Sequence, residues 1–137
     1  MITALTSVIA AIAMQAQPAL PIPDGWEGVT MPEGVMPGWF APKTLAGEKV
    51  EGDRIAAGDF LTIQTNPAGQ SFYVITRFAA NCDKPQLKKL SDRVFNAASQ
   101  QISDSPASAP WINVYKDQTP AEYAVYKHLC TATPEAD

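Results

Sequence analysis

The chain of 137 residues contains two cysteines, Cys82 and Cys130, and their spacing limits the folds that it can adopt. Only one pairing exists, and it closes a loop of about 49 residues, which stabilises a folded chain by about 4 kcal/mol in the chain-entropy model. The alternative is a pair of buried free thiols, and the compartment in which the protein works decides between the two.

The first 16 residues have the composition of a secretory signal peptide. Residues 2–14 carry no charge and are mostly Ala, Ile, Leu and Val, although no Lys or Arg precedes them. About a dozen apolar residues suit a signal-peptide core but fall short of the roughly 20 that cross a bilayer. Small residues place the cleavage after Ala13 or after Ala16, and the alternative is a buried N-terminal helix. We therefore expect a protein that is exported to the periplasm or the outer cell surface, does not span the membrane, and has paired cysteines.

The remaining length and the charge limit the partners. About 120 residues follow the leader, which allows one domain. The formal net charge is −4, and the longest basic run is Lys88–Lys89. An acidic chain of this kind repels a polyanion, so we expect no nucleic-acid partner.

Residues 17–48 are rich in Pro and Gly, which excludes long helices and central strands. The segment also carries Trp26, Trp39 and Phe40, and flexible linkers seldom contain two tryptophans. We expect an irregular strap that lays these aromatic side chains on the body of the protein. The alternative is that Trp26, Trp39 and Phe40 form an exposed binding surface.

The body, residues 49–130, begins with a predicted β-hairpin. Residues 59–65 alternate between apolar and polar side chains, residues 66–69 are a turn signal, and residues 71–82 alternate more clearly. The alternation puts Cys82 on the same face as Phe78, towards the core.

The next segments are less clear. Residues 86–95 have apolar residues at steps of three and four, which favours a helix slightly, but they also fit a strand with poor alternation. We expect a hairpin turn at residues 96–99, a loop at residues 103–110 and a short strand at residues 111–115.

The last element has a clear start signal. Thr119-Pro120-Ala121-Glu122 has the residues of a capping box, so a helix of about ten residues is predicted from there to Leu129. Cys130 follows directly, and a disulfide would tie this helix to the strand that ends at Cys82. Residues 131–137 are expected to be a frayed tail.

Few residues suggest catalysis or metal binding. His128, the one histidine, lies near the end of the predicted helix, where the helix dipole favours a cation. Asp92 and Asp104 would suit paired carboxylates, but no pattern places them together. The acidic residues around Gly52 and Gly58 match no calcium loop and are expected to form a solvated face: Glu48, Glu51, Asp53 and Asp59. We predict no catalytic residue, no metal and no cofactor.

The stretch from Arg77 to Cys130 resembles the surface-adhesin protein E-like family of small exported proteins of Gram-negative bacteria. The shared features, in chain order, are Asn81-Cys82, the 87–95 strand, Pro106, Pro110, Trp111-Ile112, and Thr119–Glu122 leading to Cys130. The turn Ala97-Ala98 and the long strap depart from the family pattern. The resemblance implies a mainly β, α+β fold in which one disulfide ties a C-terminal helix to an antiparallel sheet. It favours a strand at residues 86–95 and implies exposure at the envelope.

Three functions fit these features. The first is a non-catalytic, adhesin-like module that binds a protein or an envelope component. The second is an inhibitor of a secreted hydrolase, with the 103–110 loop as its wedge. The third is an enzyme with an unrecognised site. A homodimer is compatible with each of them.

Overall fold

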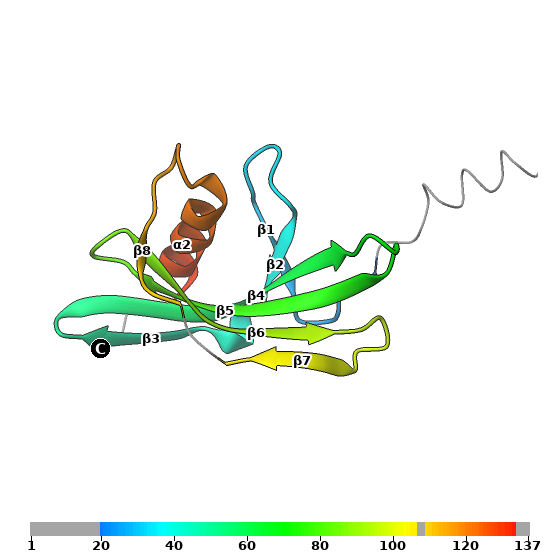
Figure 1. Ribbon diagram of the computed structural model, residues 1–137. Helices are drawn as coiled ribbons and strands as arrows, with labels where there is room; N and C mark the ends of the chain where they lie inside the picture. The colour runs from blue at the N-terminus through cyan, green and yellow to red at the C-terminus, as the bar shows by residue number, and fades with distance from the viewer. Residues whose placement is uncertain (1–19, 107–108, 134–137) are drawn as a thin grey trace, which may run out of the picture.

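The computed structural model describes residues 20–106 and 109–133 as an antiparallel β-sheet with one C-terminal helix packed on it (Figure 1). The predicted fold class, mainly β with a disulfide between the sheet and the helix, is confirmed. The expected signal peptide, residues 1–16, lies outside the described residues.

The sheet has eight strands, in the order β1-β2-β4-β5-β6-β7. Strand β3 pairs with the first half of β4, and β8 pairs with the start of β6. The elements in chain order are β1 (Glu27–Val29), β2 (Gly38–Phe40), the 3-10 helix η1 (Pro42–Thr44), β3 (Ala46–Val50), β4 (Asp53–Thr65), β5 (Ser71–Asn81), β6 (Gln86–Phe95), β7 (Gln101–Ser105), β8 (Ile112–Asn113) and the helix α2 (Pro120–Ala132).

The β4–β5 hairpin is the centre of the sheet, as the alternating pattern predicted. Its turn is held by Asn66, whose Oδ1 accepts hydrogen bonds from the N–H groups of Ala68 and Gln70. The β6–β7 turn repeats this arrangement with Asn96, and Ser99 takes the left-handed position (φ 63°) that Gly69 (φ 85°) occupies in the first turn. The expected turn at residues 96–99 is therefore confirmed without the usual glycine.

Residues 86–95 form strand β6, so the strand interpretation is confirmed and the helical one is wrong. A β-bulge explains the misleading pattern. Arg77 opposes Ser91 and Phe78 opposes Lys89, which leaves Leu90 as an extra residue in β6. An extra residue reverses the alternation of side chains from that point on, and the period of two is lost from the sequence.

Helix α2 packs on the sheet through small residues. Ala56 of β4 and Ala80 of β5 are opposite each other in the register and fully buried, and they contact the core around Leu129 and Val125. At this place Cys82 and Cys130 form the predicted disulfide, with 5.7 Å between their Cα atoms. The free-thiol alternative is thereby excluded.

The end of α2 differs from the expectation. The helix continues past Leu129 to Ala132, and Thr133 is buried, so residues 131–133 are not a frayed tail. The guanidinium of Arg54 donates hydrogen bonds to the carbonyl oxygens of Cys130 (3.0 Å) and Thr133, which satisfies groups that a helix end leaves unpaired. Residues 134–137 lie outside the described residues.

At the start of α2, Thr119 is the N-cap as predicted, but its side chain does not cap the helix. Its Oγ1 accepts a hydrogen bond from the N–H of Tyr115 (2.7 Å) and donates one to the carbonyl of the same residue (3.1 Å). The hydroxyl therefore closes the preceding turn, which the capping-box pattern alone does not reveal.

Two predicted irregular segments are partly regular. The strap, residues 17–48, contributes β1, β2 and β3, since strands of three to five residues at a sheet margin fit between prolines. The loop expected at residues 103–110 begins inside β7, which shortens the predicted wedge. The strand expected at residues 111–115 is limited to β8.

Removing the disulfide is expected to destabilise the protein strongly. Cys82→Ser or Cys130→Ser releases a cross-link worth about 4 kcal/mol, which corresponds to a fall in Tm of roughly 15 °C or more. Thermal unfolding of each variant beside the oxidised wild type measures this, with reduced wild type as the control. An unchanged Tm would contradict the prediction.

The close approach of α2 depends on Gly58. A Cβ at this position would lie 2.9 Å from Phe40 and 3.0 Å from Leu129, so Gly58→Ala is expected to lower the free energy of unfolding by about 1–3 kcal/mol. Gly28→Ala is the matched control, because a Cβ there has no atom within 4 Å. Urea denaturation compares them, and equal stabilities would refute this account.

Candidate functional site

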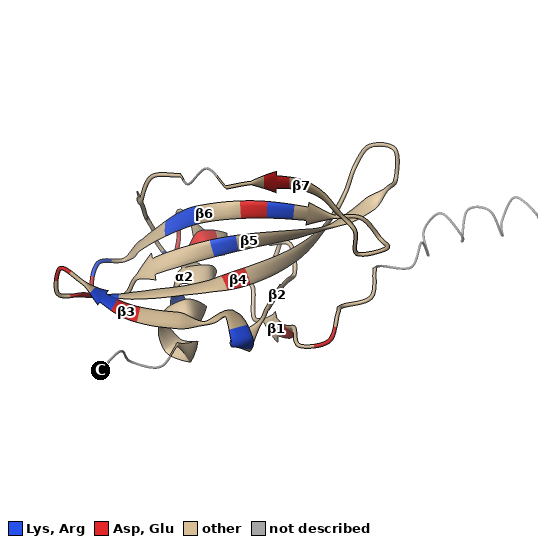
Figure 2. Cartoon of the chain, turned by 90° about the horizontal axis from the view of Figure 1, so that it is seen from below, with Lys and Arg blue, Asp and Glu red and all other residues tan. Residues whose placement is uncertain are grey.

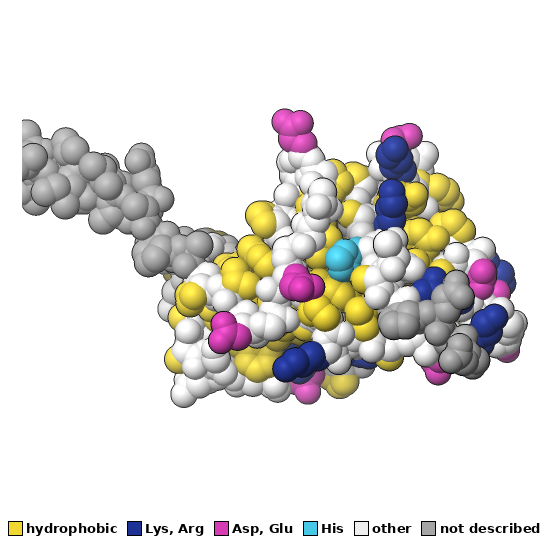
Figure 3. Space-filling model, turned by 180° about the vertical axis from the view of Figure 1, so that it is seen from behind, with side chains coloured by type: hydrophobic (Ala, Val, Ile, Leu, Met, Phe, Trp, Pro, Cys, Tyr) yellow, Lys and Arg dark blue, Asp and Glu magenta, His cyan; other side chains and the backbone are white. Residues whose placement is uncertain are grey.

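A groove of about 580 Å³ separates the β1–β2 hairpin from α2 on the helix side of the sheet. Figure 3 shows it as a hollow between two protrusions, with the histidine, in cyan, at its bottom. Residues 28–32, which end β1 and follow it, form one wall. The α2 residues of the other wall are Pro120, Tyr123, Ala124, Lys127, His128 and Thr131.

The wall on α2 is a stripe at helical spacing. Its residues follow each other at steps of three and one, which places them on one face of the helix. Val125 and Leu129 lie on the neighbouring face and are buried against the sheet. The groove was not predicted from the sequence, because only the buried face of the C-terminal helix was considered there. The second stripe of α2, which mixes apolar and charged residues, is the pattern that could have indicated it.

The opposite wall is the free edge of the sheet. Among the described residues, strand β1 is the outermost strand of the order and pairs with β2 alone. An edge strand presents N–H and C=O groups that no neighbouring strand satisfies, and an extended peptide can pair with them. The groove therefore joins an unpaired strand edge to a helix face, with Val29 and Met31 as apolar contacts on the strand side.

His128 lies at the bottom of the groove, against the core. Its ring packs edge-to-face on Phe40, with 4.4 Å between the centroids. Burial lowers the pKa of His128, and the nearby Glu27 carboxylate opposes this shift. Burial therefore disfavours the cation that the sequence suggested at this helix end, and the ring provides an aromatic surface against Phe40.

The rim of the groove is positively charged on the helix side. Lys116 and Lys127 both line it and are exposed. Exposed ammonium groups attract an acidic ligand at long range, and this attraction weakens when salt is added.

A smaller apolar hollow of about 160 Å³ adjoins the groove at the tip of the hairpin. Met31 lines both cavities, so the two are neighbours along the hairpin. Phe60, Phe78 and Val125 form its inner surface, and Met36, which is 48 % exposed, lies at its mouth. Flexible methionine side chains suit a surface that adapts to different apolar groups.

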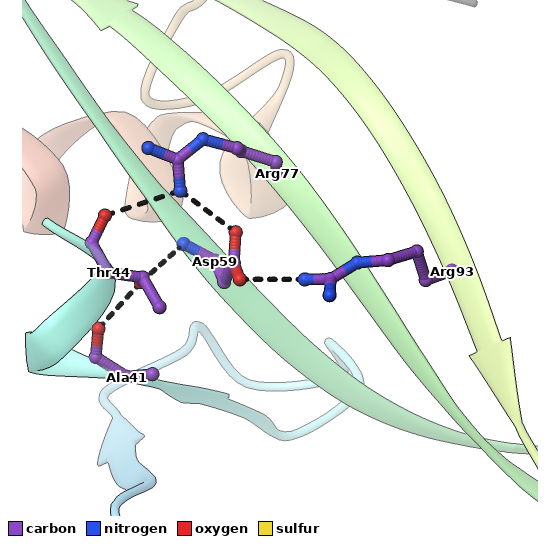
Figure 4. A network of polar contacts seen from close by, with 5 residues as sticks. All are labelled: Ala41, Thr44, Asp59, Arg77 and Arg93. Carbon is purple, nitrogen blue, oxygen red and sulfur yellow. Dashed lines mark hydrogen bonds and ion pairs between the residues drawn. The ribbon is translucent and has the colours of Figure 1, made fainter. Parts of the chain in front are cut away.

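Charged residues of β4, β5 and β6 lie near one another along the middle of the sheet (Figure 2), and Asp59, Arg77 and Arg93 form a cluster on the face opposite α2. Asp59, only 7 % exposed, accepts hydrogen bonds from Arg77 (3.0 Å) and Arg93 (2.8 Å) (Figure 4). Thr44 of η1 joins the cluster, since its Oγ1 accepts the N–H of Asp59 and its carbonyl accepts Arg77. Both carboxylate oxygens of Asp59 are occupied, and the cluster fastens η1 to three strands.

The three aromatic residues proposed as a binding surface do not lie together. Phe40 is 2 % exposed and belongs to the core beneath α2. Trp39 opposes Leu61 in the register, so its side chain lies on the other face of the sheet. Trp26 also lies on that face, where it lines a cavity with Leu61 and Tyr73.

The acidic residues considered for catalysis or metal binding are also dispersed. Asp92 accepts hydrogen bonds from Thr76 (2.6 Å) and Lys89 (2.7 Å), whereas Asp104 opposes Arg93 and lies on the other face. Asp53 is bound by Asn81 and Lys84. Within residues 20–106 and 109–133, no three His, Cys, Asp or Glu side chains are arranged to hold a metal ion.

Comparison of the chain with protein-family models, curated proteins and solved structures gives no match. The resemblance to the surface-adhesin protein E-like family therefore stays a prediction based on residues 77–130. In the part of the chain that the structure describes, no helix is long and apolar enough to cross a membrane.

The burial of His128 predicts a dependence of stability on pH. Its pKa lies lower in the folded state than its ordinary value near 6.5, so the unfolded chain binds the proton first as the pH falls. This contribution to stability is thus fully present above about pH 6.5 and decreases as the pH falls below that value. His128→Gln should lose less Tm over this range than the wild type, and equal losses in the two proteins would contradict the assignment.

Proposed function

We propose that this protein is a non-catalytic binding module that takes an extended segment of a partner protein into the groove between β1 and α2. The observation that carries the proposal is the position of β1, the edge strand of the described sheet, opposite the groove-lining stripe of α2. Peptide segments bind such an edge by adding a strand, with main-chain hydrogen bonds for affinity and alternate side chains for specificity.

The size and lining of the groove support this proposal. Its volume of about 580 Å³ lies within the roughly 300–1,000 Å³ of typical ligand sites. Val29, Met31 and Tyr123 provide apolar contacts, and Ala124 is small enough to leave the centre of the groove open. Side chains of a bound strand that point into the groove would therefore be apolar.

The charge of the rim indicates the second property of the partner segment. Lys116 and Lys127 would pair with acidic side chains, or with a terminal carboxylate, at the helix side. We expect the preferred segment to combine apolar residues at every second position with at least one acidic residue.

We propose further that the protein works in an oxidising compartment outside the cytosol, at the envelope. The Cys82–Cys130 disulfide supports this, because such bonds persist mainly in exported proteins.

Selection from a displayed library of random nine-residue peptides tests the proposed function. We expect enrichment of apolar and acidic peptides on the wild type and none on Ala124→Trp, whose indole fills the groove. Ala68→Trp, which adds the same side chain in the exposed β4–β5 turn, is the control and should select as the wild type does. Equal selection by Ala124→Trp and the wild type would refute the proposal.

The charge of the rim is tested with the selected peptides. Lys127→Glu should weaken their binding by about tenfold and reduce its dependence on salt. Lys43→Glu makes the same charge change on η1, outside the groove, and should have little effect.

A further inference from the structure

The residues that precede β1 lie across the face of the sheet opposite α2, where they are drawn in blue in Figure 1. Tyr73 of β5 fastens them, since its Oη donates a hydrogen bond of 2.5 Å to the carbonyl of Pro21. Tyr73 is 5 % exposed although it belongs to the face opposite α2. The segment Leu20–Pro23 is therefore a ligand of the sheet within the same chain.

The sequence of this segment restricts it to an extended conformation. Pro21 and Pro23 have φ fixed near −65°, and a residue before proline avoids the helical region. This applies to both Leu20 and Ile22, so every residue of the segment favours the polyproline II conformation. Such a segment loses little conformational entropy when it binds.

The surface beneath the segment has the chemistry that recognises polyproline II ligands. Aromatic side chains contact the proline rings, and a hydroxyl or indole donor binds a ligand carbonyl. Here Trp26, Tyr73 and Phe95 line the cleft and Tyr73 is the donor, while Leu20 and Ile22 of the segment are half-buried and Pro21 and Pro23 are exposed. Pro23 lines the same cleft, which is completed by Leu61, Ile75 and Ser99.

The chain's own segment leaves part of this cleft empty. A cavity of about 200 Å³ remains beside Pro23, and its lining is mostly apolar. A ligand that carries a larger apolar residue at this position would bury surface that Pro23 leaves open.

We infer that this cleft is a recognition site for a proline-rich extended segment of a partner protein, and that Leu20–Pro23 occupies it as a competing intramolecular ligand. The inference is independent of the proposed function, because the cleft lies on the other face of the sheet from the β1–α2 groove. A partner can bind only molecules in which the segment has left the cleft. Its apparent affinity is therefore its intrinsic affinity multiplied by the fraction of molecules whose cleft is open.

The test uses the full chain and a synthetic peptide with the sequence of residues 18–25. In the double variant Pro21→Gly, Pro23→Gly the competing segment is weakened, so calorimetry should give an apparent Kd about tenfold lower than for the wild type. A peptide with glycine at each proline position should bind neither protein. Equal binding of the two peptides, or no binding at millimolar concentration, would overturn the inference.

Tyr73→Phe identifies the site while it preserves the packing of the ring. Added to the double variant, this substitution should weaken the binding of the proline peptide by about fivefold, which is the effect of losing one hydrogen bond. Tyr115→Phe removes the hydroxyl of an exposed tyrosine outside the cleft and should change nothing. Amide chemical shifts establish that each variant is folded, and Pro23→Ala replaces the double variant if that protein unfolds.

A second copy of the chain is the other occupant that the test distinguishes. If sedimentation shows a stable wild-type dimer and cross-links join residue 21 of one molecule to residue 73 of another, the cleft binds the same segment of a second copy of the chain. The inference would then be wrong.

Discussion

The close contact of α2 with the sheet determines the rest of the structure. Ala56, Gly58 and Ala80 give the helix a surface without bulky side chains, and the Cys82–Cys130 disulfide holds it there. Leu129 then reaches the sheet and is almost fully buried. Because the helix lies so deep, its next face stands beside the β1–β2 hairpin rather than above it. The groove is the space between α2 and the β1–β2 hairpin. Its width depends on how deeply the helix is seated, and therefore on the small residues Ala56, Gly58 and Ala80 beneath the helix, which do not line the groove.

The alternation of side chains along β4 and β5 explains why the two faces of the sheet differ. Side chains at even positions, such as Ala56 and Ala80, form the seat of α2, whereas odd positions carry Asp59, Arg77 and Tyr73 on the other face. Among the residues that the structure describes, no α-helix covers the second face. The charge cluster holds η1 against the middle of this face. The hydrogen bond from Tyr73 to the Pro21 carbonyl holds the segment Leu20–Pro23 farther along the same face. Two short segments from the N-terminal part of the chain thus replace the missing second layer.

The elements that could be predicted are those defined by residues close together in the sequence. The central β4–β5 hairpin with its turn at Asn66, the β6–β7 turn at Asn96 and the start of α2 follow from residue periodicity and turn chemistry, and the disulfide follows from the cysteine count. The bulge at Leu90 hid strand β6, because a single extra residue removes the period of two. The stripe on α2 could have indicated one wall of the groove, but the opposite wall and the cleft could not be predicted, since each depends on where the strap crosses the sheet. Only pairing over long sequence distances, such as Trp39 with Leu61, places these residues.

Strand β2 connects the two candidate sites although they lie on opposite faces. Trp39 and Phe40 are consecutive, so their side chains point in opposite directions: Phe40 packs on His128 beneath the groove, and Trp39 lies on the face that holds the cleft. Only these two residues of β2 pair with β4, against Phe60 and Leu61. The same short contact therefore fixes the β1 edge on one face and the direction of the chain from residues 20–26 on the other. If a ligand at one face changes the affinity at the other face through β2, linkage requires the reverse effect to have the same free energy.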